Sequence, residues 1–560
     1  MSSAFMKHSL LFLSLLLAPI VLQAEEGPGK AAVASAHYLA TEAGHEVLAE
    51  GGNAFDAAIA VSAALAVVEP TSSGLGGGGF WLLHRASDGF EVMIDGREKA
   101  PAAATPDMFL NSAGEIDRDR AYNGPLAAGI PGEPAALVHL AQHYGRLSLG
   151  KSLAPAIRLA EQGFEVGEKY SRRIQRRAAV MRRYPATAAV FLDHGQAPAR
   201  GSRLVQKDLG FVLRQIAAHG LDGFYRGEVA KRLVQGVVHD GGIWSAADLA
   251  NYRVAERKPI RFAYRGATVV SAAPPAAGGV VLAEMLHILG GFDLSRLAED
   301  ARDHVIIEAM RRAYRDRNAY LGDPDFVKMP IARLISEDYA AGLQASIRMD
   351  RATASDSLPG YAPRDSGPHT THFSVIDADG NLVAGTLTVN LSFGSAYVAP
   401  GTGLLLNNEL DDFAAKPGAP NAYGLVQYAA NAIAPGKRPL SSMTPTFVFD
   451  GKRTAVLGTP GGSRITTMVL LGVLDFMAGH GPRSWVSLPR FHHQFLPDSV
   501  SFEPGAFSAD VQAKLQARGH NLRGRSRRWG SMNAVMWDRN NNTLSAASDP
   551  RNEDGKAVVE

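Results

Sequence analysis

The pattern of apolar residues changes near residue 360, and this change limits the folds open to the chain more than any other feature. Before it, apolar residues recur every three or four positions, as in residues 31–70 and 300–322, which predicts helices. After it, β-rich runs flank Asp379-Gly380 and Asp450-Gly451, and such dipeptides are typical of tight hairpin turns. Residues 534–549 indicate a third pair of strands. The last third is therefore predicted to be largely antiparallel sheet.

Thr370 stands at the start of the first predicted strand, directly after a stretch rich in Pro and Gly (residues 358–369). A threonine hydroxyl is a poor nucleophile at neutral pH unless a base lies beside it. Cleavage of the bond between His369 and Thr370 would free the α-amino group of Thr370. Such a group has a pKa of about 7.7 to 8.0, which suits a general base. We therefore predict an N-terminal nucleophile that is created by self-cleavage.

Composition and charge exclude several kinds of site. The 560 residues include no cysteine, which excludes a thiol nucleophile, a thiolate metal site and a disulfide framework. A net charge of +2 gives no general attraction to nucleic acid. Two basic runs, residues 169–185 and 523–530, are local. Such runs are more often solvated faces than patches for nucleic acid or anionic membranes, so no nucleic-acid partner is expected.

The N-terminus has the pattern of a targeting segment. Lys7 and His8 precede an apolar run over residues 10–22, and a cut after Ala24 is expected. This predicts a signal peptide of residues 1–24 that is removed on export, with a retained N-terminal anchor as the alternative. The run is short for a membrane span, and no other stretch is long and apolar enough, so no stable span is predicted.

Three literal motif matches are better explained by structure than by chemistry. Residues 74–79 (GLGGGG) fit G-x-G-x-x-G but follow a helical run, which favours a close backbone crossing over a nucleotide site. Ser148 and Lys151 fit S-x-x-K, but the companion elements are absent. His492 and His493 are adjacent and point in different directions, which favours structural histidines over metal ligands. No metal or organic cofactor is expected.

Six polar elements occur in a recognisable order. They are IDGREKAPAAAT, PHTTHFSVIDADGN, TLTVNLSFG, GLLLNNELDDF, KRPLSSMTPT and GTPGGSRI. Together they resemble the γ-glutamyltransferase family (γ-glutamyltranspeptidase, glutathione hydrolase), over about residues 29 to 551. The resemblance implies the α+β fold of N-terminal nucleophile hydrolases, an αββα sandwich of two antiparallel sheets flanked by helices. Residues 25–369 (the helix-rich large subunit) and 370–560 (the β-rich small subunit) are then expected to form one intertwined domain.

The resemblance also implies the roles of residues around the reacting bond. Thr370 matches the nucleophile, and Thr388 matches a threonine whose hydroxyl supports it. Gly461 and Gly462 match the backbone oxyanion hole, where the lack of a Cβ lets the backbone approach an oxyanion closely. Tyr423 falls where a tyrosine of a lid over the pocket is expected.

A further set of matched residues is implied to hold the substrate head group. The α-carboxylate is assigned to Arg97, Ser441 and Ser442, and the α-ammonium is assigned to Asn390, Glu409 and Asp412. The chemistry agrees, because a γ-glutamyl group ends in a zwitterion remote from the scissile amide. A guanidinium fork suits the carboxylate, and carboxylate and amide oxygens suit the ammonium.

The resemblance implies a transfer reaction without a cofactor. A γ-glutamyl-enzyme forms on Thr370, and water, an amino acid or a dipeptide then accepts the acyl group, with glutathione as the natural substrate among other γ-glutamyl compounds. The two subunits are expected to remain together as a heterodimer. The export signal and the expected lid favour the periplasm, with secretion as the alternative. Two other functions stay open: a cephalosporin or glutaryl acylase of the same fold, and an exported glutamyl-peptide-binding protein that is never processed.

Overall fold

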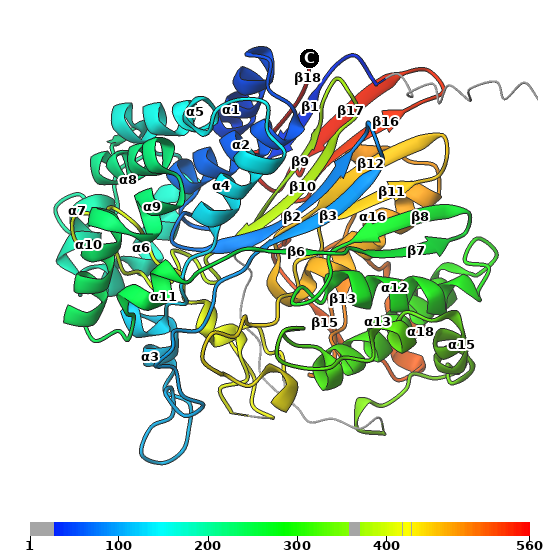
Figure 1. Ribbon diagram of the computed structural model, residues 1–560. Helices are drawn as coiled ribbons and strands as arrows, with labels where there is room; N and C mark the ends of the chain where they lie inside the picture. Colours follow the sequence, from blue (N-terminus) through cyan, green and yellow to red (C-terminus); the bar gives the residue numbers. More distant parts are fainter. Residues whose placement is uncertain (1–26, 358–369, 417, 427) are drawn as a thin grey trace, which may run out of the picture.

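The computed structural model describes residues 27–357, 370–416, 418–426 and 428–560, and its centre is a pair of stacked antiparallel sheets (Figure 1). The strands of the first sheet, in spatial order, are β18 (Lys556–Val559), β1 (Ala32–Ser35), β9 (Thr371–Ile376), β10 (Leu382–Thr388), β2 (Gly78–Arg85), β3 (Phe90–Gly96) and β6 (Ala255–Arg257). Those of the second are β17 (Thr543–Ser548), β16 (Asn533–Asp538), β12 (Arg453–Gly458), β11 (Thr446–Phe449), β8 (Ala267–Ser271) and β7 (Ile260–Tyr264).

Helices cover both outer faces of the sandwich (Figure 1). Helices α1 (Tyr38–Ala49), α2 (Ala54–Val68), α4 (Glu133–His143) and α5 (Leu149–Gln162) lie on the side of the first sheet. Helices α12 (Gly278–Gly290) and α16 (Ile465–Met477) pack on the second sheet, and α13 (Glu299–Tyr320) and α15 (Glu337–Ala345) pack on α12. The predicted four-layer fold is confirmed.

The remaining elements are short or peripheral. The other helices are α3 (Arg118–Tyr122), α6 (Glu168–Met181), α7 (Pro185–Phe191), α8 (Lys207–His219), α9 (Leu221–Tyr225), α10 (Gly227–His239), α11 (Ala246–Ala250), α14 (Ile331–Leu334), α17 (Pro482–Ser487) and α18 (Ala509–Ala517). Short 3-10 turns are η1 (Pro125–Ala127), η2 (Ser355–Ser357), η3 (Glu409–Asp412), η4 (Ala429–Asn431) and η5 (Gly462–Arg464). Two small sheets contain β4 (Phe164–Glu165) with β5 (Arg203–Leu204), and β13 (Phe491–His492) with β14 (Val500–Phe502) and β15 (Leu522–Gly524).

Each sheet contains strands from before and from after residue 370, and these strands pair directly. In the first sheet β9 lies between β1 and β10, so that Thr371 pairs with Leu387 and Ala32 pairs with Ile376. In the second sheet β11 lies between β8 and β12. Backbone hydrogen bonds therefore join the two parts of the chain across both sheets, and Thr370 directly precedes a central strand.

The three predicted hairpins are confirmed, and local chemistry explains the first. The turn between β9 and β10 places Gly380 at φ 84°, a conformation that glycine adopts without steric cost. Asp377 accepts hydrogen bonds from the backbone N–H groups of Asp379 and Asn381. Its other oxygen accepts from the N–H of Ala54, which connects this turn to the start of α2.

The three motif matches have structural explanations. Gly76 and Gly77 lie between α2 and β2, where an added Cβ would collide with the backbones of Leu405 and Thr388, so the predicted close approach is confirmed. Ser148 is the N-cap of α5, and its hydroxyl accepts from the N–H of Lys151. Both His492 and His493 are buried, and each is hydrogen-bonded to neighbouring side chains.

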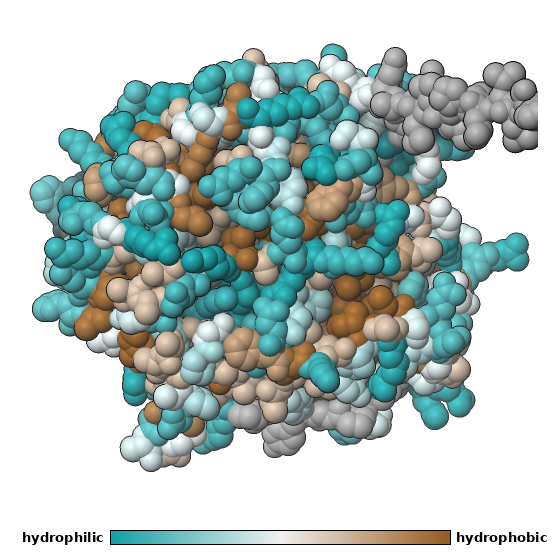
Figure 2. Space-filling view, in the orientation of Figure 1, coloured by the Kyte–Doolittle hydropathy of each residue, from teal (hydrophilic) through white to brown (hydrophobic). Residues whose placement is uncertain are grey.

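The surface of the face shown in Figure 2 is mainly hydrophilic, with apolar side chains in small groups. Within the described residues, no helix combines the length and apolar character that a membrane crossing requires. The predicted signal peptide and His369 lie outside the described residues.

Candidate active site

Thr370 directly precedes β9, is only 6% exposed, and borders two separate cavities. The smaller one, here called the head-group cavity, is lined by most of the predicted site residues: Thr370, Thr388, Asn390, Glu409, Asp412, Tyr423, Ser441, Ser442 and Gly462. The fold therefore brings together residues from six separate segments of the sequence. The individual role of each residue stays a prediction.

The end of β10 presents a buried acceptor to this cavity. The hydroxyl oxygen of Thr388 accepts a hydrogen bond from the N–H of Asn390 (2.7 Å), and the backbone of Asn390 has φ 70°. Asparagine is one of the few residues other than glycine that adopts this region readily. The Asn390 amide donates to the carbonyl of Asn408 (2.9 Å), while its Oδ1 has no hydrogen-bond partner among the described residues. This oxygen is available to an N–H donor in the cavity.

Arg97, directly after β3, is fully buried and is held by carboxylates. Its Nη2 lies 2.6 Å from Oδ2 of Asp412, its Nη1 is hydrogen-bonded to Glu409, and Glu98 is 3.5 Å away. Both Glu409 and Asp412 belong to the 3-10 turn η3. The guanidinium is thus bonded to the residues predicted for the ammonium. Its predicted contact with a substrate carboxylate stays a prediction.

Three carboxylates, those of Glu98, Glu409 and Asp412, surround the single guanidinium of Arg97. Burial raises the pKa of Glu409 well above its usual range, and it also raises that of Asp412, although Arg97 opposes both shifts. Burial likewise raises the pKa of Glu98 to about 7. Oxygen Oε2 of Glu409 has no hydrogen-bond partner among the described residues. An added cation would relieve this crowding of buried negative charge, as a substrate ammonium does.

Arg317 is a site residue that the sequence analysis missed. It lines the head-group cavity from α13, is 2% exposed, and donates from Nη2 to the hydroxyl of Ser442 (3.0 Å). Its Nε has no hydrogen-bond partner, and it forms no ion pair with a carboxylate among the described residues. Burial lowers its pKa to about 10, so it still carries its charge at neutral pH. Arg317 and Ser442 together offer donors to a carboxylate.

No local signal distinguishes Arg317 in the sequence. Helix α13 carries several arginines within two turns, and Arg311, Arg312 and Arg315 bind other partners. Only the packing of α13 against the loop that contains Ser442 selects Arg317 for the cavity. Ser441, the neighbouring predicted residue, accepts at its hydroxyl from the N–H of Met443 (3.1 Å).

The predicted oxyanion hole lies where a glycine loop enters a helix. Gly462 begins η5, which continues directly into α16, so backbone N–H groups at this helix start lack intrahelical partners. Gly462 has φ 58°, and a Cβ there would collide with the ring of Tyr423. A Cβ on Gly461 would collide with Met468. Gly462 therefore requires glycine for both its space and its positive φ, whereas the contact at Gly461 is with the end of a flexible side chain.

Tyr423 closes the head-group cavity. Its hydroxyl donates to the carbonyl of Asn390 (2.8 Å), and its ring is packed on Gly462. The space measures about 20 Å³, little more than one water molecule occupies. A glutamyl group is larger than this space, so it does not fit in the described conformation.

A buried acid that contacts the residue after Thr370 was also missed. Glu69, which follows α2, accepts at Oε2 from the hydroxyl of Thr371 (2.8 Å), and Lys169 lies 3.9 Å from its other oxygen. Burial raises the pKa of Glu69, and Lys169 opposes that shift. The contact anchors the residue next to Thr370 in the first sheet.

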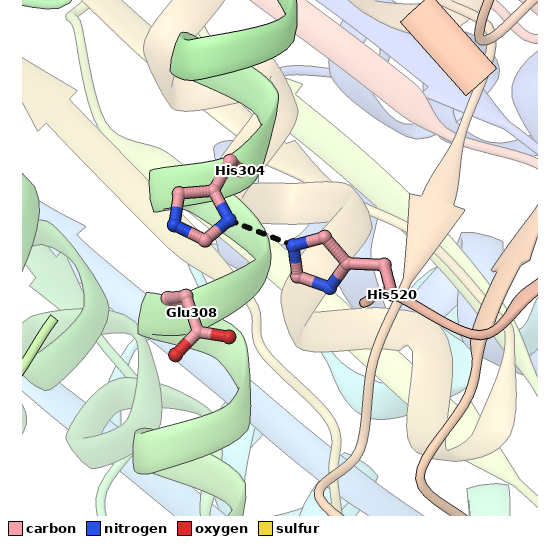
Figure 3. A group of neighbouring side chains, drawn as sticks. All are labelled: His304, Glu308 and His520. Carbon is pink, nitrogen blue, oxygen red and sulfur yellow. Dashed lines mark hydrogen bonds between the residues drawn. The ribbon is translucent and has the colours of Figure 1, made fainter. Parts of the chain in front are cut away.

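One group of side chains in the described part of the chain has the composition of a metal site: His304, Glu308 and His520 (Figure 3). The two histidines are hydrogen-bonded to each other (2.8 Å), and Nε2 of His304 bonds to the carbonyl of Arg348. Glu308 already binds Arg311 (3.1 Å) and Arg312 (2.6 Å), which lower its pKa to about 2 against the effect of burial. A metal ion would have to displace two guanidinium groups, so these residues fit a structural tie better than a metal centre.

Comparison with known proteins extends the likeness over nearly the whole chain. A profile described as Gamma-glutamyltranspeptidase matches residues 40–559. A glutathione hydrolase proenzyme of Pseudomonas sp. (strain A14) is 45% identical, with 90% of this chain and 88% of the relative covered. One of Escherichia coli (strain K12) is 43% identical, with 93% and 90% covered. The crystal structure of cephalosporin acylase from Bacillus halodurans superposes with a TM-score of 0.83 at 28% identity, covering 95% of this chain and 96% of that one.

Proposed function

The chain belongs to the γ-glutamyltranspeptidase family, and we propose that it cleaves the γ-glutamyl amide of glutathione and related compounds, passing the acyl group to water or to an amine. The proposal rests on one observation. Beside Thr370, a single buried cavity presents unpartnered acceptors (Asn390 Oδ1 and Glu409 Oε2) together with the donors of Arg317. A zwitterionic head group complements these two sets of atoms.

Maturation is proposed to occur at the bond between His369 and Thr370. The Thr370 hydroxyl attacks the His369 carbonyl, the C–N bond breaks as an ester forms, and the hydroxyl proton passes to the freed amine. Water then hydrolyses the ester, which leaves residues 25–369 and 370–560. Because strands of both products are hydrogen-bonded to one another in the two sheets, we expect the products to stay together as a heterodimer.

Turnover uses the same hydroxyl. The head group is held with its ammonium near Asn390, Glu409 and Asp412, and its carboxylate near Arg317, Ser441 and Ser442, while Arg97 orients the two acids. The α-amine of Thr370 accepts the hydroxyl proton as the oxygen attacks the γ-carbonyl, and the backbone at Gly461 and Gly462 stabilises the oxyanion. The leaving amine takes the proton, and water or an acceptor amine then releases the acyl group by the reverse steps.

The acylase alternative differs in the head group that it requires. A glutaryl group lacks the α-ammonium and gives no reason to bury Glu409 and Asp412 with unpartnered acceptors beside them. Two glutathione hydrolase proenzymes are 45% and 43% identical to the chain, whereas an Acylase ACY 1 proenzyme of Pseudomonas sp. (strain V22) is 37% identical. We therefore favour the γ-glutamyl substrate.

The deciding experiment combines a denaturing gel with two chromogenic substrates. We expect two bands, of the sizes of residues 25–369 and 370–560, and much faster turnover of γ-glutamyl-p-nitroanilide than of glutaryl-p-nitroanilide. A faster glutaryl reaction would identify an acylase. A single band that binds γ-glutamyl peptides without turnover would identify a binding protein.

Export to the periplasm is proposed from the N-terminal segment. Its support is the apolar run of residues 10–22 behind Lys7, together with the expected cut after Ala24. N-terminal sequencing of the large subunit from fractionated cells tests it. A large subunit that begins at Met1 in the cytoplasmic fraction would contradict it.

A further inference from the structure

The two basic runs of the sequence, expected to be separate solvated faces, line one groove that reaches Thr370. Helix α6 contributes Lys169, Arg172, Arg173 and Arg176 to this groove. The loop between β15 and β16 contributes Arg525, Arg527 and Arg528. The groove measures about 830 Å³, within the usual range of ligand sites. We call it the basic groove.

Much of the positive charge in the basic groove is not neutralised by the protein. Arg172, Arg176, Arg527 and Arg528 are exposed, and none of them forms an ion pair with a carboxylate among the described residues. The acidic member of the lining is Glu69, which already interacts with Thr371 and Lys169. Free guanidinium groups of this kind attract carboxylates.

The groove lies on the amine side of the scissile bond. Thr370 borders both the head-group cavity and the basic groove, and so does the glycine loop, because Gly462 lines the former and Pro460 the latter. A γ-glutamyl carbonyl at Thr370 has its head group in the first cavity. The leaving amine, or the acceptor that replaces it, must therefore extend into the basic groove.

Resting on the proposed function, we propose that the basic groove selects peptides with several carboxylates as acceptors and as leaving groups. In transfer, the peptide amine attacks the acyl ester, a C–N bond forms as the bond to the Thr370 oxygen breaks, and the amine proton returns through the Thr370 amine to that oxygen. The carboxylates of the peptide remain in the groove, where Arg172, Arg176, Arg527 and Arg528 hold them.

Two features favour a short acidic peptide over a nucleic acid. The adjoining pocket, which shares Glu69, Lys169 and Arg173 with the groove, contains Glu165, Glu168, Glu553 and Asp554, and these would repel a continuing polyanion. The indole of Trp529 is buried and covered by the guanidinium of Arg464, 5.2 Å from the ring centre, so it offers no platform on which bases stack.

The test is an acceptor competition with the processed enzyme. γ-Glutamyl-p-nitroanilide is the donor, Gly-Gly, Glu-Glu and Lys-Lys are the acceptors at low ionic strength, and the γ-glutamyl dipeptides are measured by chromatography. We expect Glu-Glu to be used best and Lys-Lys least. The double variant Arg527→Gln/Arg528→Gln should reduce the preference for Glu-Glu over Gly-Gly about fivefold, as the loss of two exposed ion pairs would. Release of p-nitroaniline without an acceptor should not change.

Arg296→Gln is the matched control, since Arg296 is an exposed arginine that does not line the groove. Equal use of the three acceptors, or a preference that the double variant leaves intact, would overturn the proposal. Loss of binding to single-stranded DNA or anionic vesicles in the double variant, with no acceptor preference in the wild type, would also overturn it and assign the groove to that partner. No p-nitroaniline release from the processed wild type would contradict the proposed function, and the acceptor role with it.

Discussion

The two cavities that meet at Thr370 use arginine in opposite ways. In the head-group cavity, Arg97 and Arg317 are almost completely buried, and each is fixed by neighbouring side chains. In the basic groove, Arg527 and Arg528 are exposed and form no ion pair with described residues. The first arrangement has one geometry, which suits recognition of one head group. The exposed side chains of the second arrangement keep more rotamer freedom.

Burial determines how much free energy is lost when a charge is removed. Removing one member of a buried ion pair leaves its partner uncompensated and typically costs about 3 to 5 kcal/mol. An exposed ion pair is worth about 1 kcal/mol or less and is screened by salt. Substitutions in the head-group cavity should therefore affect turnover far more than substitutions in the groove.

The largest effect is expected at the residue that both cavities share. Thr370→Ala should leave a single uncleaved chain and lower activity by on the order of 10⁴ or more, because nucleophile and base are lost together. Thr370→Ser, which keeps a hydroxyl, is the control and should retain some cleavage. A gel and a p-nitroanilide assay measure both. Hydrolysis that persists in Thr370→Ala would place the nucleophile elsewhere.

The next effect tests the ammonium side of the head-group cavity. Asp412→Asn should lower kcat/KM for γ-glutamyl-p-nitroanilide by about 10² to 10³, the loss expected for a buried charge contact. The glutaryl analogue should lose much less. Asp411→Asn is a matched control, since Asp411 is a buried neighbour in η3 that does not line the cavity. Equal losses for both substrates would argue against the assigned contact.

Arg317 tests the carboxylate side. Arg317→Gln should raise KM for the γ-glutamyl substrate by about tenfold to a hundredfold, because a charged hydrogen bond to the carboxylate is lost. Arg315→Gln is the control on the same helix, since Arg315 binds Asp316 and Tyr339 instead. An unchanged KM in Arg317→Gln would leave the carboxylate to Arg97.

Lowering the pH should weaken head-group recognition by about tenfold. Burial raises the pKa values of Glu409 and Asp412, so as pH falls they bind protons before exposed carboxylates do and lose the charge that attracts an ammonium. The ratio of γ-glutamyl to glutaryl turnover should therefore fall as the pH is lowered, and the fall should begin above the pH range in which exposed carboxylates titrate. Overall rates should fall too, as the Thr370 amine is protonated. A constant ratio would show that the carboxylates stay ionised.

The smallest effect separates the two cavities by salt. Raising the ionic strength from about 0.01 M to about 0.5 M shortens the screening length severalfold. The preference for Glu-Glu as acceptor should fall a few-fold, while KM for the donor should change little, because its contacts are buried. If KM for the donor shifts as much as the acceptor preference does, the two cavities do not differ in the way that their burial indicates.

Local sequence signals predicted much of the architecture. Asp379-Gly380 and Asp450-Gly451 each specify a turn whose positive φ only a few residues accept, so both hairpins were predictable without the rest of the fold. The spacing of apolar residues predicted α2 and α13 for a similar reason, since helices require only neighbours in the chain. The match of Arg97, Glu409 and Asp412 to a known family pattern located the head-group cavity. That pattern did not indicate that the three side chains bind one another.

The features that the sequence did not predict depend on contacts between distant segments. Arg317 is one of several similar residues on α13, and only the loop at Ser442 distinguishes it. Glu69 accepts a hydrogen bond from Thr371, which lies in a distant part of the chain. The two basic runs acquire a shared surface because α6 and the loop before β16 meet beside Thr370.

Short runs of residues predicted which segments form helices and hairpins, which residue is the candidate nucleophile, and which family the chain resembles, because these properties depend on neighbours in the chain. Which charges are buried and which are exposed depends on the tertiary structure. The same guanidinium group becomes a fixed, paired element at Arg97 and a solvated one at Arg527, because the free energy of a charge depends on the atoms that surround it. Those atoms come from segments that only the folded chain brings together.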